Sequence, residues 1–271
     1  MMEEAKSIQE IQKVDVPTIL QSSFLFLMFA WVLDILFAYR DLGLLEHTSE
    51  LAAQGQQIPP HTDWVLQIFF PVIWIFLLIG YWLFANGIAE TPIGARSILP
   101  KMLKLLVLTC ACLVILITAN SLYLHLVMSR AIWILFLSLH LLETILSCFG
   151  LLATLIFLKC LIRFAKAANT SLLEILCWLD LFISISGFLI FSAGNISYIL
   201  IEVDFHLLRF ISIEFLIFLH NIRLFSEPCY QRIEMVNGII NLVAILLAAS
   251  IKQLLFRIDS EYPSLTPSSR A

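Results

Sequence analysis

Long apolar stretches, separated by short polar connections, make up most of this 271-residue chain. A helix needs roughly 20 mostly apolar residues to cross the hydrocarbon core of a bilayer. The stretches that reach this length lie at residues 18–39, 64–85, 105–128, 131–158, 175–201, 205–225 and 235–256. The pattern predicts an all-α membrane protein, a polytopic transmembrane helical bundle of about seven spans. It also predicts a polar N-terminal segment at 1–17 and a C-terminal tail at 257–271.

The composition supports this prediction and excludes one class of partner. Apolar residues make up 61% of the chain and charged residues 13%. A soluble domain carries about 25% charged residues, because its water-facing surface requires them. The 16 Lys and Arg residues form no basic run of the kind that contacts nucleic acid. We therefore expect the lipid bilayer and other membrane protein subunits as partners, and no nucleic acid.

The sequence contains no familiar catalytic or cofactor motif. Cys110 and Cys112 have the wrong spacing for the usual zinc or redox pairs, and they point to different faces of a helix. A glycine-rich phosphate loop, a His-Glu-x-x-His motif and a Gly-x-Ser-x-Gly motif are all missing. We expect no metal, no cofactor and no enzymatic activity.

The basic residues indicate an orientation. With seven spans and a cytoplasmic N-terminus, ten Lys and Arg residues fall on the inner side and six elsewhere. If 205–225 does not cross, the tail returns to the inner side and the distribution becomes eleven to five. We predict a cytoplasmic N-terminus in a plasma membrane or endomembrane. Asn195, in an Asn-Ile-Ser sequon on the predicted outer side, is a candidate for glycosylation.

Ionisable residues inside the spans are the main candidates for function, because such groups are costly in hydrocarbon. The intramembrane polar cluster that we predict consists of Asp34, His140, Glu143, Asp180, Arg209 and Glu214. One interpretation is purely structural: Asp34 pairs with Arg209, and His140 pairs with Glu214 at matching depth. Contacts of this kind fix the register of neighbouring helices without doing chemistry.

A second interpretation is a cation or proton path. Its candidate residues are Glu143, Glu214, Asp180 and His140. Carboxyl and imidazole groups can exchange protons, which is what a relay across a membrane requires.

A third interpretation is a membrane haem protein. His206 and His220 are 14 residues apart on one predicted span, which places them near one helix face. This spacing resembles transmembrane dihaem cytochromes, which have a second histidine pair on a neighbouring helix. The candidates for that pair are His125 and His140, which lie on two different predicted spans.

One local pattern resembles the voltage-sensor domains of cation channels. The segment Trp178-Leu179-Asp180-Leu181-Phe182 looks like the start of the third helix of that family. The following predicted span, with Arg209 and Arg223, looks like a charge-depleted fourth helix. The resemblance implies a sensor-like bundle within residues 105–225.

Gly187 and Gly194 lie inside one predicted span and indicate a kink or close helix packing. Taken together, the short loops favour a non-enzymatic accessory or assembly subunit of a membrane complex, whose helices contact other membrane components. The alternative is a small ion- or proton-coupled transporter or a channel-like protein.

Overall fold

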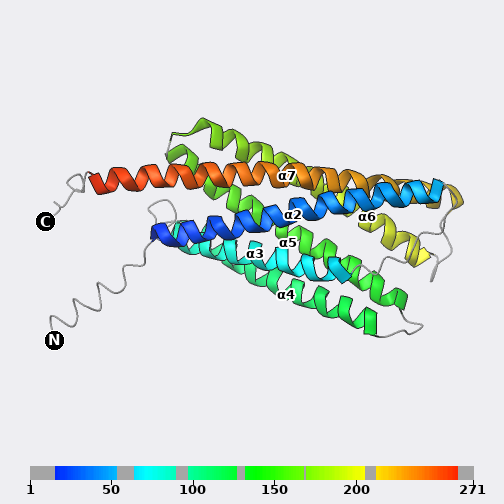
Figure 1. Cartoon of the computed structure of the whole chain (residues 1–271). Coiled ribbons are helices and arrows are strands. Elements are labelled where there is room, and N and C mark those ends of the chain that lie inside the picture. The colour runs from blue at the N-terminus through cyan, green and yellow to red at the C-terminus, as the bar shows by residue number, and fades with distance from the viewer. Residues whose placement is uncertain are drawn as a thin grey trace, which may run out of the picture.

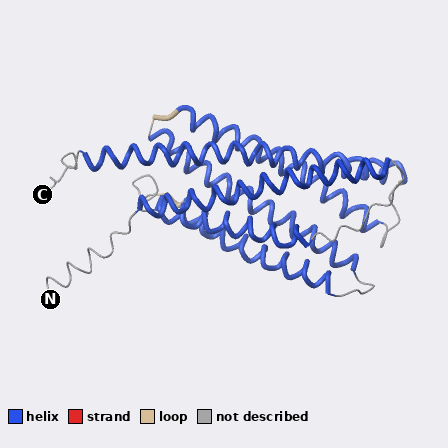
Figure 2. The backbone as a smooth tube through the Cα atoms, viewed as in Figure 1, coloured by secondary structure: helices blue, strands red, loops and turns tan. Residues whose placement is uncertain are grey.

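The computed structural model describes residues 16–53, 64–89, 97–126, 132–167, 169–204 and 212–261. Within these ranges the chain is helical apart from short turns, and they contain no strand (Figure 2). The helices are α2 (Val16–Ala53), α3 (Trp64–Ala89), α4 (Leu99–Leu126), α5 (Ile132–Ala167), α6 (Ser171–Val203) and α7 (Ile213–Glu261). Each of the six contains a stretch long and apolar enough to cross a membrane. The predicted fold class, a polytopic helical membrane bundle, is confirmed.

The number of spans is six in the described residues, not seven. The predicted spans 205–225 and 235–256 are not separate, because α7 runs without interruption from Ile213 to Glu261. Pro228 lies inside α7. Proline removes one main-chain hydrogen bond, and a helix packed among neighbours tolerates that loss. The residues between 225 and 235, which the span prediction leaves as a connection, lie on the helix.

The six helices form a closed ring in chain order. Each helix packs against the one before it, and α7 packs against α2. Consecutive helices run in opposite directions, so α2 begins and α7 ends at the same end of the bundle (Figure 1). We call this the terminal end. A tight turn at this end joins α5 to α6, where Asn169 adopts a left-handed φ of 53° and Thr170 donates its main-chain N–H to Ala165 O at 2.9 Å.

Glycines allow α3 to approach α2 closely, and α6 to approach α7. A Cβ at Gly80 would lie 2.6 Å from Leu27 Cγ, and one at Gly87 would lie 2.6 Å from Leu20 Cδ2, so α3 fits against α2 at two points seven residues apart. On α6, Gly187 and Gly194 repeat this spacing against α7. Close helix packing, rather than a kink, is therefore the role of these α6 glycines.

Gly194→Ala is expected to destabilise the contact between α6 and α7. The added Cβ would lie 2.3 Å from Ser226 Oγ and 3.1 Å from Ser226 Cβ. Overpacking of this kind costs about 1–3 kcal/mol. The thermal unfolding midpoint of the detergent-purified protein should fall, and Gly194→Ala/Ser226→Ala should recover part of the loss. Full wild-type stability of the single variant would contradict the close approach.

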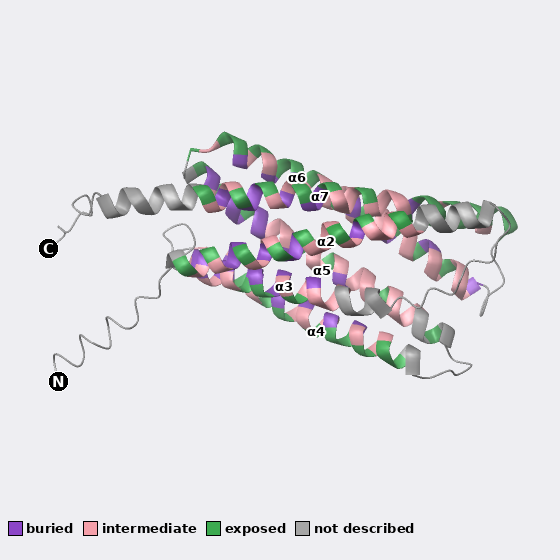
Figure 3. Cartoon of the chain, in the orientation of Figure 1, coloured by how far each residue is buried: buried purple, intermediate pink, exposed green. Residues whose placement is uncertain are grey.

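The interior differs between the two halves of the bundle. Buried apolar side chains concentrate towards the terminal end, and they include Phe84, Phe157, Leu161, Leu173 and Ile245. Towards the opposite end, α5, α6 and α7 turn polar side chains to one another. The outer faces are largely exposed and apolar, which suits contact with lipid (Figure 3). The half of the bundle away from the termini therefore offers the polar interior on which a functional site can be built.

Candidate functional site

One face of α7 carries a row of polar residues through the bundle. Their spacing alternates between four and three residues, so they lie along one helix face. The row consists of Arg223, Glu227, Tyr230, Glu234, Asn237 and Asn241. Together with the polar side chains that face it from α5 and α6, we call this row the polar lane.

The first cavity along the polar lane lies towards the start of α7. It has a volume of about 230 Å³. Polar and charged side chains dominate its lining, among them His140, Glu143, Asn195, Tyr198, Arg223, Ser226, Glu227 and Gln231. A space of this size holds several water molecules, and the polar lining can hydrogen-bond to them.

An aromatic and charged cluster organises one wall of the first cavity. His140 Nδ1 lies 3.2 Å from Glu143 Oε2, one turn further along α5. The His140 ring centroid is 4.3 Å from that of Tyr198, and the Arg223 guanidinium carbon is 4.4 Å from the same Tyr198 ring. Asn195 Nδ2 donates to Thr144 Oγ1 at 3.2 Å and so ties α6 to α5. The cluster places an acid, an imidazole and a guanidinium at one site.

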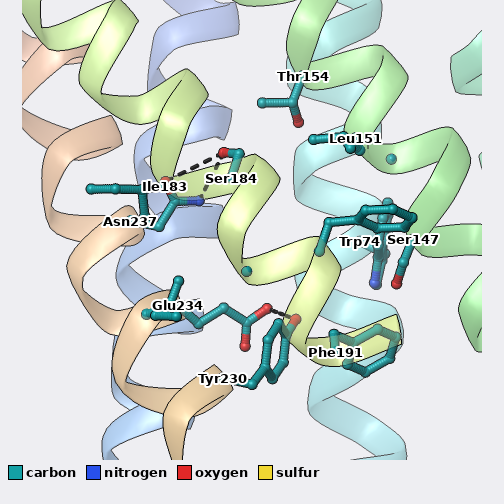
Figure 4. Close-up of a pocket in the computed structure, with 14 residues that line it drawn as sticks. Trp74, Ser147, Leu151, Thr154, Ile183, Ser184, Phe191, Tyr230, Glu234 and Asn237 are labelled. Carbon is teal, nitrogen blue, oxygen red and sulfur yellow. Dashed lines mark hydrogen bonds between the residues drawn. The ribbon is translucent and has the colours of Figure 1, made fainter. Parts of the chain in front are cut away.

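The second cavity continues the polar lane towards the terminal end. It has a volume of about 130 Å³, and Thr154, Ser184, Glu234 and Asn237 are among its lining residues (Figure 4). Phe191 and Tyr230 line both cavities. Their ring centroids are 4.9 Å apart. These two rings therefore stand at the boundary between the cavities.

A pair of carboxyl groups lies beside this boundary. Glu234 accepts a hydrogen bond from the Tyr230 hydroxyl (Figure 4). Glu234 also lies within electrostatic range of Asp34 on α2. The carboxyl oxygens of the two acids can accept protons or bind cations, and they offer nothing that attracts an anion.

A buried cluster ends the polar lane, and we call it the Asp180 cluster. Asp180 Oδ1 accepts hydrogen bonds from Asn241 Nδ2 at 2.8 Å and from Ser184 Oγ at 3.2 Å. The amide of Asn237 lies beside Ser184, with Nδ2 at 3.3 Å and Oδ1 at 3.4 Å from Ser184 Oγ (Figure 4). Asp180 is 0% exposed and Asn241 is 1% exposed. The cluster thus links α6 and α7 deep in the bundle.

Beyond the Asp180 cluster the interior becomes apolar. Cys177 lies about one helical turn from Asp180, Leu173 one turn further, and Ile245 about one turn beyond Asn241. All three are fully buried. The polar lane therefore runs from the first cavity, on the side opposite the termini, to the Asp180 cluster, and apolar packing follows it on the terminal side.

The structure brings together only part of the predicted polar cluster. His140 and Glu143 line the first cavity, Asp180 is the buried end of the lane, and Asp34 lies within electrostatic range of Glu234. Glu214 is exposed in the first turn of α7 and lines neither cavity, so His140 contacts Glu143 rather than Glu214. Arg209 lies outside the described residues.

The other predicted sites have different surroundings from those expected. Asn195, the glycosylation candidate, lines the first cavity and bonds to Thr144. His220 is exposed, the His140 ring is tilted against that of Tyr198, and the haem interpretation stays a prediction. His206 lies outside the described residues, as does the side chain of His125. Among the described residues, no group of three His, Cys, Asp or Glu could hold a metal ion.

The α7 members of the polar lane are the functional candidates that the sequence analysis missed. Tyr230 and Glu234 fall between the predicted spans 205–225 and 235–256, where the apolar pattern predicts no helix. The alternation of four- and three-residue steps from Arg223 to Asn241 was a usable signal, because a loop has no reason to keep a helical period.

Comparison of the chain with protein-family models, with curated proteins and with solved structures found no match.

Proposed function

We propose that this multi-pass membrane protein moves small cations, protons among them, along the polar lane. The observation that carries the proposal is the pair of cavities joined at Phe191 and Tyr230. A network that only holds helices together needs hydrogen bonds, but it does not need water-sized space beside them. The cavities provide that space, and water in them would lower the cost of a charge inside the bilayer.

The charge of the cavity linings supports a cation as the cargo. Glu143, Glu227 and Glu234 line the two cavities, with Arg223 as the one guanidinium among the lining residues. The neighbouring Asp34 and Asp180 add further carboxyl groups. A low-dielectric channel lined by acids concentrates cations and repels anions.

The apolar packing at the terminal end supports a closed state of the pathway. Leu173, Cys177 and Ile245 stand between the Asp180 cluster and that end of the bundle. An ion that enters from the opposite end would pass the Phe191 and Tyr230 rings, reach Asp180 and go no further until the helices separate on the terminal side. This is the arrangement of a carrier with one side open, in which each ion requires a conformational change.

The six spans in the described residues change the predicted side of the C-terminal tail but not that of the N-terminus. An even number of crossings puts both termini on one side, which corresponds to the predicted distribution of eleven to five basic residues. We propose that the terminal end is cytoplasmic, so that the polar lane opens to the other side of the membrane.

Reconstitution into liposomes tests the proposed function. The purified protein should produce uptake of H⁺, Na⁺ or K⁺ above protein-free vesicles when a membrane potential is imposed. Glu234→Gln keeps the side-chain shape but removes the carboxyl group that can bind a proton or a cation, and it should slow uptake by about tenfold or more, equivalent to about 1.4 kcal/mol. Glu214→Gln is the matched control, because Glu214 is exposed and lines neither cavity.

Two results would contradict the proposal. One is the absence of flux for all three cations with correctly folded protein. The other is an equal loss in Glu214→Gln and Glu234→Gln, because the effect would then not depend on the polar lane. The predicted role as an accessory or assembly subunit has no feature of the site in its favour and remains a prediction.

A further inference from the structure

One oxygen atom in the Asp180 cluster has no partner. Asp180 Oδ1 accepts from Asn241 and Ser184, but Oδ2 is buried and makes no hydrogen bond in the part of the chain that the structure describes. A carboxylate oxygen that is removed from water and left unpaired is costly. Protonation would remove the charge, and a bound cation would balance it while also using the hydroxyl and amide oxygens beside Asp180 as ligands.

From this atom and its neighbours we infer that the Asp180 cluster binds a monovalent alkali cation of the size of Na⁺. A cation beside Asp180 Oδ2 would satisfy the oxygen and balance the carboxylate charge. The inference deepens the proposed function, on which it rests for the role of the ion, because it assigns a cation to the closed end of the same pathway.

The donor atoms around Asp180 fit a hard, singly charged ion. Besides the carboxylate, the cluster offers the Ser184 hydroxyl oxygen and the amide oxygen of Asn237, all within one hydrogen-bonded group. Asn241 can present its own amide oxygen if the side chain turns over. Carboxylate, hydroxyl and amide oxygens are ligands for hard cations, whereas soft metals prefer thiolate or imidazole.

The charge of the cluster argues for a monovalent rather than a divalent ion. Asp180 is the one carboxyl group in the Asp180 cluster, and the described residues contain no group of three acidic, His or Cys side chains suited to a metal. A divalent ion would leave an uncompensated positive charge in a fully buried site, which is strongly unfavourable. One carboxylate and one Na⁺ leave no net charge.

The second cavity gives the cation access and water. Ser184 and Asn237 line it, so the cluster is directly beside a space of about 130 Å³. Waters in this cavity can complete the coordination shell where protein oxygens do not reach. On the other side, buried Cys177 and Leu173 keep water away. The site is therefore reached from the polar lane only.

Ion-dependent stability and direct binding test the inference without any need for transport. The protein, purified in mild detergent, is heated in NaCl, KCl or choline chloride at constant ionic strength, and ²²Na⁺ binding is measured in parallel. The unfolding midpoint should rise saturably with Na⁺, as expected for a ligand that binds the folded state. Choline, which is too large for the cluster, should have no such effect.

Variants locate the binding site. Asp180→Asn should weaken the apparent Na⁺ affinity by about tenfold or more, a factor that corresponds to about 1.4 kcal/mol. Because Asp180→Asn could also disturb folding, Ser184→Ala provides a milder test and should weaken Na⁺ binding while the protein keeps its elution volume and helical content. Glu214→Gln, outside the cluster, should bind Na⁺ as the wild type does.

The outcomes separate this inference from the proposed function. Equal stabilisation by Na⁺ and choline, or undiminished ²²Na⁺ binding in both Asp180→Asn and Ser184→Ala, would overturn the cation site. Saturable Na⁺ binding that both variants weaken would support the site even if no flux is found in liposomes. Proton flux without Na⁺ binding would leave the proposed function in place and refute the inference.

Discussion

Phe191→Ala is expected to expose the second cavity to water-soluble reagents from the end of the bundle opposite the termini. In the wild type the Phe191 and Tyr230 rings lie 4.9 Å apart at the boundary between the two cavities. Removal of one ring leaves the first cavity continuous with the second. A cysteine placed at Ser184, on the wall of the second cavity, reports whether the path is open.

The rate of thiol modification is the measurement. In a background without the native cysteines, Ser184→Cys should react slowly with a charged, membrane-impermeant thiosulfonate. Addition of Phe191→Ala should raise the rate by about 100-fold, equivalent to removing about 2.7 kcal/mol from the barrier. The reaction should occur when the reagent is added from the side opposite the termini.

Phe188→Ala is the matched control for this experiment. Phe188 lies three residues from Phe191 on α6 and lines the second cavity but not the first. It should therefore leave the rate close to that of Ser184→Cys alone, whereas Asn195→Cys, in the first cavity, should react quickly with or without Phe191→Ala. Equal acceleration by Phe188→Ala and Phe191→Ala would show that general loosening, not an opened boundary, is responsible.

Epitopes fused before Met1 and after Ala271 are expected to lie on the same side of the membrane. The two closely spaced apolar stretches near the C-terminus predict seven spans and termini on opposite sides. In the structure, one helix of 49 residues, α7, contains residues 213–225 of the first stretch and all of the second. At a rise of about 1.5 Å per residue, α7 is about 73 Å long, more than twice the hydrocarbon thickness.

Sealed vesicles of known orientation give an all-or-none result for this prediction. Both epitopes should be accessible to antibody or protease from one side only. Glu214→Cys, in the first turn of α7, should be labelled from the other side. Epitopes on opposite sides, or Glu214→Cys on the same side as the C-terminal epitope, would show that 205–225 crosses as a separate span.

The candidate site was predictable only in part, and the reason lies in α7. His140, Glu143 and Asp180 stand out in the sequence because each interrupts an apolar run. Glu234 and Tyr230 do not, because the stretch around Pro228 is polar enough to look like a loop. A charge in hydrocarbon is conspicuous, whereas a charge among other polar residues is not, although both can lie inside the same bundle.

Pairing between helices was the least predictable feature. Depth along each predicted span suggested His140 with Glu214, but the structure places Glu214 in an exposed first turn and gives His140 Glu143 and Tyr198 as neighbours. The depth of a residue in the membrane is counted from the end of its predicted span. One wrongly predicted span therefore gives wrong depths for its own residues and for those that follow.

The sequence by itself determined that the chain is a bundle of membrane-crossing helices, because runs of apolar residues too poor in charge to face water have few other stable arrangements. It also singled out His140, Glu143 and Asp180 as ionisable groups within apolar runs. Only the tertiary structure decided that α6 and α7 meet along glycine contacts and that α7 is one helix. It also decided that Asp34, Tyr230, Glu234 and Asp180 share one interior. These depend on which helix faces meet, and in a chain that is apolar on nearly every face the hydrophobic pattern no longer distinguishes one face from another.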